Sequence, residues 1–126
     1  MNPKIKKVRQ SLVTVIILAM AAGFISCEKY SYSPPSIDPS VTWHFQTDIQ
    51  PIFINDNCVN CHNGTRSPDL RSGKSYDALT KGGFVNSPAA SSILYNQMNK
   101  SDHLPRSTEA DRLKVLYWIT QGAQNN

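Results

Sequence analysis

Apolar side chains recur at helical spacing in three parts of the chain, and each part predicts one helix. The first helix is expected at residues 47–57, with Asp48 as its N-cap and Pro51 in its first turn, where the missing N–H costs little. The residues expected on its buried side are Phe45, Ile49, Ile52 and Phe53. A domain core is therefore expected to begin close to this helix.

Two further helices and one shorter turn follow. A middle helix is predicted at residues 89–99, and a last helix at residues 108–121, with Ser107 as its cap and Gly122 as its stop. The apolar face of the middle helix holds Ile93, Leu94 and Met98. The apolar residues of the last helix include Ala110, Leu113, Leu116, Tyr117 and Ile119. A short helical turn is expected at residues 75–79, and since no segment alternates convincingly, the predicted fold class is all-α.

The chain begins with positive charges, followed by an apolar stretch at residues 12–25 and a cysteine. The basic residues are Lys4, Lys6, Lys7 and Arg9. The apolar stretch is short for a membrane-spanning helix, and its end at Ser26-Cys27 resembles the lipobox of bacterial lipoproteins, although Phe24 stands where that motif usually has leucine. We predict a lipoprotein-type signal peptide at residues 1–27 with lipidation of Cys27. An uncleaved membrane anchor and an ordinary secretory signal are the alternatives.

The distribution of charge changes how the basic composition is interpreted. The chain has a formal net charge of +4, but four of its 13 basic residues and none of its nine acidic residues precede Cys27. From Cys27 onward there are nine of each, so nothing favours nucleic-acid binding. Residues 28–42 are rich in Ser and Pro and predict a disordered tether. Residues 43–126 predict one small domain, whose core a bound cofactor would help to complete.

The chemically most informative segment is CVNCH at residues 58–62. Two thiols at this spacing can each bond one vinyl group of a haem, and the adjacent imidazole can bind the iron from the proximal side. The motif predicts one covalent haem c held by Cys58, Cys61 and His62, with Pro68 or a neighbour supplying an acceptor for the other nitrogen of His62. A thioredoxin-type redox pair, a structural zinc site completed by another histidine, and chance are the alternatives.

The order of several motifs resembles that of small monohaem cytochrome c domains of bacteria, including the planctomycete type, over roughly the last eighty residues. The matching segments are DIQPIF at 48–53, the C-x-x-C-H motif, SYDAL at 75–79 before Gly82-Gly83, SILY at 92–95 and WITQGA at 118–123. The resemblance implies a cytochrome c-like fold of three to four helices around one covalently bound haem, with the first and last helices crossing.

The chain departs from that family where the distal iron ligand is expected. Members usually carry a Met-Pro motif just before the last helix, whereas residues 102–106 read DHLPR, and Leu104 cannot bind iron. His103 and Met98 are the candidates for the distal ligand, with an open position as the third possibility and His44 as a distant one. A methionine ligand raises the reduction potential, and a second imidazole leaves it lower.

The predicted function is electron transfer by one haem that cycles between ferrous and ferric iron outside the cytoplasm, without enzyme activity or catalytic residues. The alternative is a haem enzyme or small-ligand site of the peroxidase type, which requires an open distal position. A haem sensor or structural lipoprotein forms a third class. The expected partners are redox proteins and a membrane, reached through the lipid on Cys27, and the expected location is the periplasm or the cell surface.

Overall fold

The structure is a computed structural model that describes residues 3–5, 7, 10, 13–14, 32–33 and 36–126. The chain divides into two compact units, Met1–Ser33 and Pro34–Asn126. In the first unit, the described residues at 3–5, 7, 10 and 13–14 are helical and exposed. Cys27 and most of the predicted signal peptide lie outside the described residues. A search of the described part of the chain found no helix with the length and apolarity needed to cross a membrane.

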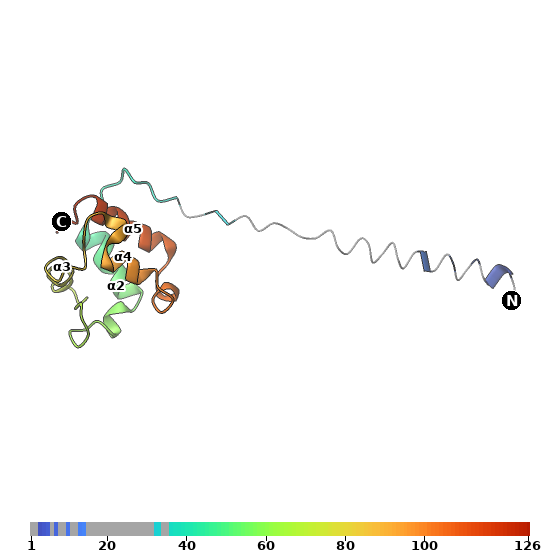
Figure 1. Cartoon of the computed structure of the whole chain (residues 1–126), viewed down its shortest axis with the longest axis horizontal. Helices are drawn as coiled ribbons and strands as arrows, with labels where there is room; N and C mark the ends of the chain where they lie inside the picture. Colours follow the sequence, from blue (N-terminus) through green and yellow to red (C-terminus); the bar gives the residue numbers. More distant parts are fainter. Residues whose placement is uncertain (1–2, 6, 8–9, 11–12, 15–31, 34–35) are drawn as a thin grey trace. The chain divides into compact units, whose positions relative to one another are not determined.

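The second unit is built from short helical elements, and residues 36–126 contain no strand. This confirms the prediction of an all-α fold. The α-helices are labelled in Figure 1. In chain order the elements are the π-helical turn η1 (Phe45–Ile49), α2 (Gln50–Asn55), the 3-10 turn η2 (Cys58–Asn60), α3 (Ser75–Thr80), the 3-10 turn η3 (Ala89–Ser91), α4 (Ile93–Met98), the 3-10 turn η4 (Leu104–Arg106) and α5 (Glu109–Thr120).

The first predicted helix begins two residues earlier than expected, because η1 runs directly into α2. Asp48 is not its N-cap. The residue before η1 is His44, and the Asp48 carboxylate lies inside the turn and accepts a hydrogen bond of 2.8 Å from the His44 backbone N–H. Pro51 lies in the first turn of α2, as predicted. The four predicted core residues, Phe45, Ile49, Ile52 and Phe53, are all buried.

The middle helix is interrupted at Ser92, so residues 89–99 do not form one continuous α-helix. Ser92 has an extended ψ of 135°, and its hydroxyl donates a hydrogen bond of 2.7 Å to the Phe84 carbonyl. A side-chain bond of this kind competes with helical geometry. The interruption turns Ile93 outward, where it is 42% exposed, so its predicted place on one face with Leu94 and Met98 is wrong.

Thr108, and not Ser107, caps the last helix. The Thr108 hydroxyl accepts a hydrogen bond of 3.1 Å from the Asp111 N–H, and Thr108 has the extended backbone that an N-cap requires. Ile119 is buried as predicted. The other fully buried positions of α5 are Val115 and Trp118, whereas Ala110, Leu113, Leu116 and Tyr117 are half-buried.

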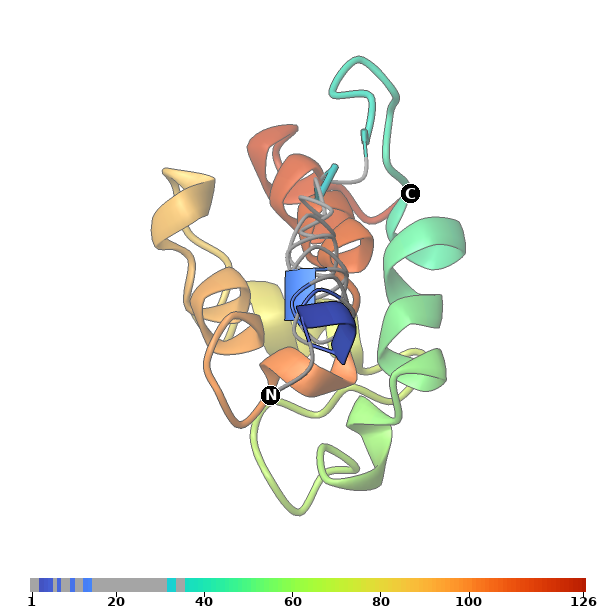
Figure 2. The same cartoon turned by 90° about the vertical axis from the view of Figure 1, so that its right-hand side faces the viewer.

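Aromatic packing joins the first and last helical segments of the second unit. The Phe45 ring in η1 lies 5.1 Å from the Trp118 ring of α5 and 5.2 Å from the Tyr76 ring, measured between centroids. The end of the chain returns to the same place, since the Asn126 carbonyl accepts a hydrogen bond of 3.0 Å from the Gln46 N–H. Figure 2 shows the C-terminus beside the start of the unit, with the segment after α2 (green) and the turn before α5 (orange) towards the other end.

Candidate functional site

The C-x-x-C-H motif forms a tight turn directly after α2. Asn57 has φ of +57°, in the left-handed region, and this reverses the chain so that η2 can begin at Cys58. The Cys58 carbonyl then accepts hydrogen bonds from the N–H groups of Cys61, at 3.2 Å, and His62, at 3.0 Å. The turn therefore brings the two thiols and the imidazole of the motif to one side of the unit.

A cavity of about 240 Å³ opens beside this turn, and a second hollow of about 190 Å³ adjoins it. The first is lined mainly by apolar side chains from several elements: Phe53, Pro68, Leu70, Phe84, Leu94 and Met98. The residues common to both hollows are Cys58, His62, Arg66 and His103. Cys61 lines the second hollow. Cys58 and His62 therefore line one apolar cavity, and Cys61 lines the hollow that adjoins it.

The ring of His62 is fixed by a backbone acceptor. Its Nδ1 lies 3.0 Å from the Pro68 carbonyl oxygen, within hydrogen-bond geometry. The His62 carbonyl in turn accepts a hydrogen bond of 2.8 Å from the Leu70 N–H. A histidine that donates from Nδ1 to a carbonyl keeps Nε2 as the free, metal-binding nitrogen. The predicted acceptor from Pro68 or its neighbours is therefore present, and it comes from Pro68.

The loop that supplies this acceptor has its own anchors. Gly64 has φ of +97°, and the Arg71 guanidinium packs so close to it that an added Cβ would lie 2.7 Å from Nη2. The Arg71 guanidinium also donates to both carboxylate oxygens of Asp69, at 3.0 Å to Oδ1 and 2.7 Å to Oδ2, which holds the pKa of the Asp69 carboxyl below its usual value. Behind the loop, Gln50 is 4% exposed and donates to the Leu70 carbonyl.

The two thiols differ in environment. Cys58 is half-buried and Cys61 is exposed, and both are free. Burial raises the pKa of the Cys58 thiol, and the negative charge of Asp56 raises it further. Nucleophilic cysteines of redox pairs have lowered pKa values, because positive charge or a helix end stabilises the thiolate. The environment of Cys58 therefore disfavours the thioredoxin-type alternative.

The two candidates for the distal ligand both line the first cavity. The rings of His62 and His103 have centroids 6.4 Å apart and planes inclined by 41°. Met98 is 7% exposed and belongs to the hydrophobic core. Leu104 is 41% exposed and lines neither hollow. His44, the residue before η1, also lines neither hollow.

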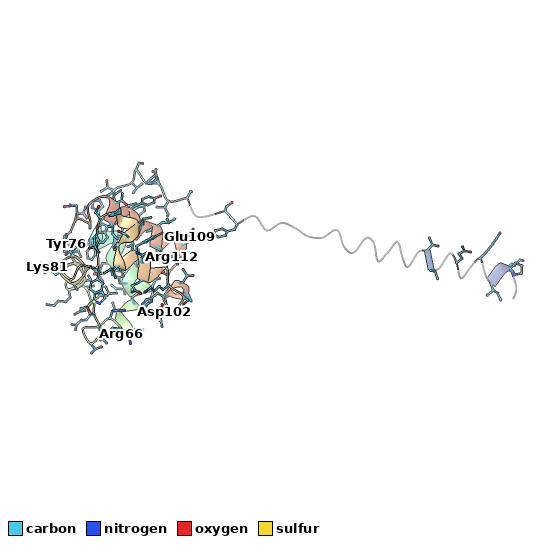
Figure 3. The ribbon with its side chains drawn as sticks, in the orientation of Figure 1. Arg66, Tyr76, Lys81, Asp102, Glu109 and Arg112 are labelled. Atoms are coloured by element: carbon cyan, nitrogen blue, oxygen red, sulfur yellow. The ribbon has the colours of Figure 1, made fainter. Side chains whose placement is uncertain are left out.

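Sequence reasoning missed the charged residues at the edge of the cavity. Arg66 lines both hollows, and Arg106 and Asp102 line the second. Figure 3 shows Arg66 and Asp102 at the same end of the unit. No sequence signal distinguishes these residues from other surface charges, because the loops that carry them meet only in the folded chain.

No group of three His, Cys, Asp or Glu side chains in the described ranges is arranged to hold a metal ion. Comparisons of the chain with protein-family models, with curated proteins and with solved structures found no match. The site is therefore interpreted from its own geometry and chemistry.

Proposed function

We propose that this chain is a lipid-anchored c-type cytochrome that carries single electrons outside the cytoplasm through one haem. The observation that carries the proposal is the environment of His62. Its Nδ1 is bound to the Pro68 carbonyl, so Nε2 is free at the wall of an apolar cavity that Cys58 also lines. This is the arrangement that a proximal haem ligand beside a thioether-forming cysteine requires.

The residues at the cavity suit a haem in three respects. The apolar wall matches the flat, largely apolar face of a porphyrin and excludes water from it. The two hollows adjoin at Cys58 and His62, and their sizes together are within the range of roughly 300–1,000 Å³ in which cofactors bind. Arg66 and Arg106 stand at the edge, where guanidinium groups can pair with the propionate carboxylates.

Cys58 and Cys61 would hold the haem covalently. Each thiol would add its S–H across one vinyl double bond, so that sulfur would bond to one carbon and hydrogen to the other, with no net oxidation. Burial raises the pKa of the Cys58 thiol, which favours the S–H form that this addition would consume. His62 would bind the iron through Nε2. When bound, the haem supplies an iron that alternates between ferrous and ferric states.

The fold proposed for the second unit is cytochrome c-like, with three to four helices around the haem. It is supported by the packing of Phe45 in η1 against Trp118 in α5, which brings together the first and last helical segments. The exposed side of the site, with Cys61, Arg66 and Arg106, would be the edge at which redox partner proteins dock. Such encounters are weak and bury little surface.

The attachment is tested with a Cys58→Ala, Cys61→Ala double variant made with a c-type maturation system. Haem that survives denaturation is measured by its absorbance on the denatured chain. The wild type is expected to retain one haem, and the double variant none. The matched control is Asn60→Ala, which changes an exposed residue between the cysteines and should retain haem. Covalent haem on the double variant would contradict the proposal.

The anchor is a separate part of the proposal. Residues 1–27 are proposed to be a lipoprotein signal, with Cys27 lipidated and residues 28–42 as a tether. The carrier would then work at a membrane facing the periplasm or cell surface. Cys27→Ser should remove lipid labelling and release the protein from the membrane fraction. A labelled, membrane-bound product of this variant would rule out lipidation at Cys27 and leave the haem site unaffected.

A further inference from the structure

We propose that His103 is the second axial ligand of the haem iron, opposite His62, an inference that rests on the function proposed above. It follows from the position of His103 in the cavity, the distance between the two rings, the state of its buried nitrogen and the anchoring of its loop. The site would then have two imidazole ligands and no open position on the iron.

The separation of the two rings is that of two imidazoles bound to one metal ion. A metal–imidazole nitrogen bond is about 2 Å long, so the bonds and ring radii on both sides add to a centroid separation of roughly 6 Å. The centroids of His62 and His103 are 6.4 Å apart. Both rings line both hollows, so the space between and beside them belongs to the same cavity.

The buried ring nitrogen of His103 faces a carboxylate. Nδ1 is inaccessible to solvent and lies 3.0 Å from Asp102 Oδ1, within ion-pair distance. Asp102 therefore occupies this side of the ring and leaves Nε2 for a metal ion. A bond from one ring nitrogen to iron leaves the hydrogen on the other, for which Asp102 is an adjacent acceptor.

The backbone that carries His103 is held firmly. The His103 N–H donates to the Lys100 carbonyl at 2.9 Å, and the His103 carbonyl accepts from the Arg106 N–H at 2.9 Å. The loop residues after His103 are held as well, because the Arg112 guanidinium of α5 donates to the carbonyls of Ser107, at 2.5 Å, and Leu104, at 3.5 Å. A ligand on such a loop binds without a large loss of conformational entropy.

Neither neighbouring residue offers a better ligand. Leu104 has no metal-binding atom and is exposed. Met98 has a thioether and lines the first cavity, but it packs with Leu94 inside the hydrophobic core. Its burial is explained by this packing alone. The ring of His103 is 37% exposed and belongs to no such cluster, so packing does not account for its position.

The test is an optical and electron paramagnetic resonance study of the haem-loaded protein and three variants. The wild type is expected to be low-spin in the ferric state, without the far-red band of a sulfur ligand. His103→Ala should lose the low-spin form and regain it when imidazole is added. His103→Met should stay folded and gain the far-red band. Met98→Leu, the matched control, should keep the wild-type spectrum.

Two results would overturn the inference while leaving the haem site intact. One is a far-red band in the wild type that Met98→Leu abolishes, which would assign the ligand to Met98. The other is a wild type that is high-spin, or a His103→Ala variant whose spectrum is the same as that of the wild type. Either outcome would show that His103 does not bind iron. A wild type without covalent haem would instead refute the proposed function itself, so the two failures are distinguishable.

Discussion

The side-chain amide of Gln50 donates a hydrogen bond of 3.1 Å to the carbonyl of Leu70, twenty residues further along the chain. The same amide accepts a hydrogen bond from the Ser75 hydroxyl, at the start of α3. Leu70 itself donates to the His62 carbonyl. A buried glutamine of α2 is thereby connected, through one loop residue, to the proposed proximal ligand.

Gln50→Ala tests this connection. It removes both hydrogen bonds and leaves the Leu70 carbonyl and the Ser75 hydroxyl buried without partners, so the free energy of unfolding should fall by about 1–3 kcal/mol. The loop that fixes His62 loosens as well, and the ferric spectrum should broaden. Gln46→Ala is the matched control, since Gln46 is exposed and its change should stay within about 0.5 kcal/mol. Equal effects of the two substitutions, measured by denaturant unfolding, would show that Gln50 has no special role.

Arg112 is predicted to hold the loop that carries His103. Arg112→Ala removes the charged donor to the Ser107 and Leu104 carbonyls and should lower the free energy of unfolding by roughly 1.5–3 kcal/mol. In the haem-loaded protein it should also convert part of the low-spin iron to the high-spin form. Lys81→Ala, at an exposed ion pair with Asp77, should cost less than about 1 kcal/mol and leave the spin state unchanged. A spin state that does not respond to Arg112→Ala would show that the Arg112 hydrogen bonds do not influence iron binding by His103.

The cap of α5 can be tested with adjacent hydroxyl residues. Thr108→Ala removes the side-chain acceptor of the Asp111 N–H and should lower the free energy of unfolding by roughly 0.5–2 kcal/mol. Ser107→Ala should have a smaller effect. The Ser107 hydroxyl accepts a long hydrogen bond of 3.4 Å from an Arg112 nitrogen and caps no backbone N–H group. The ranking is measured by chemical denaturation, and a larger loss at Ser107 would contradict the capping assignment.

Asp56 is predicted to oppose folding at neutral pH. Burial raises the pKa of its carboxyl, the negative charge of Asp111 raises it further, and its Oδ2 is buried without a hydrogen-bond partner. The folded state therefore holds the proton more tightly than the unfolded chain, and the ionised form destabilises the fold above the folded-state pKa. Asp56→Asn should raise the melting temperature at neutral pH.

The advantage of Asp56→Asn should shrink as the pH falls through the folded-state pKa towards the ordinary value of 3.8, because the wild-type carboxyl then becomes neutral too. Thermal unfolding followed from neutral to acidic pH measures this convergence. Asp77→Asn serves as the control, since Asp77 is exposed. An advantage of Asp56→Asn that is the same at every pH would show that the charge is not its cause.

The sequence predicted the helical segments and the buried side of the first helix, because apolar periodicity reports directly which face a helix buries. It also placed the acceptor for His62 near Pro68, since a histidine that is expected to bind metal needs an acceptor for its other nitrogen. It did not predict the break at Ser92 or the choice of Thr108 as cap. The break depends on the hydrogen bond from Ser92 to the Phe84 carbonyl, and the cap depends on backbone angles that neighbouring hydroxyl residues can adopt equally well.

The role of Gln50 could not be predicted, because a glutamine in an amphipathic helix is usually solvated. Only the packing of α2 against the Leu70 loop and α3 buries it. The approach of the His103 ring to the His62 ring is likewise a tertiary result, since forty-one positions separate them in the chain. The sequence left His103, Met98 and an open position as alternatives, and the spectra described above decide among them.

The two ends of the second unit meet at η1, and this has a further consequence for how the unit can be built into larger molecules. Asn126 bonds to Phe45 and Gln46, and Gln121 bonds to Val41 and Trp43. A domain whose ends adjoin tolerates circular permutation and insertion into a host loop. A short linker from residue 126 back to residue 43 should therefore allow new termini to be opened elsewhere on the surface. The second unit could then be fused to an electrode-bound or enzyme scaffold in whichever orientation the new termini dictate.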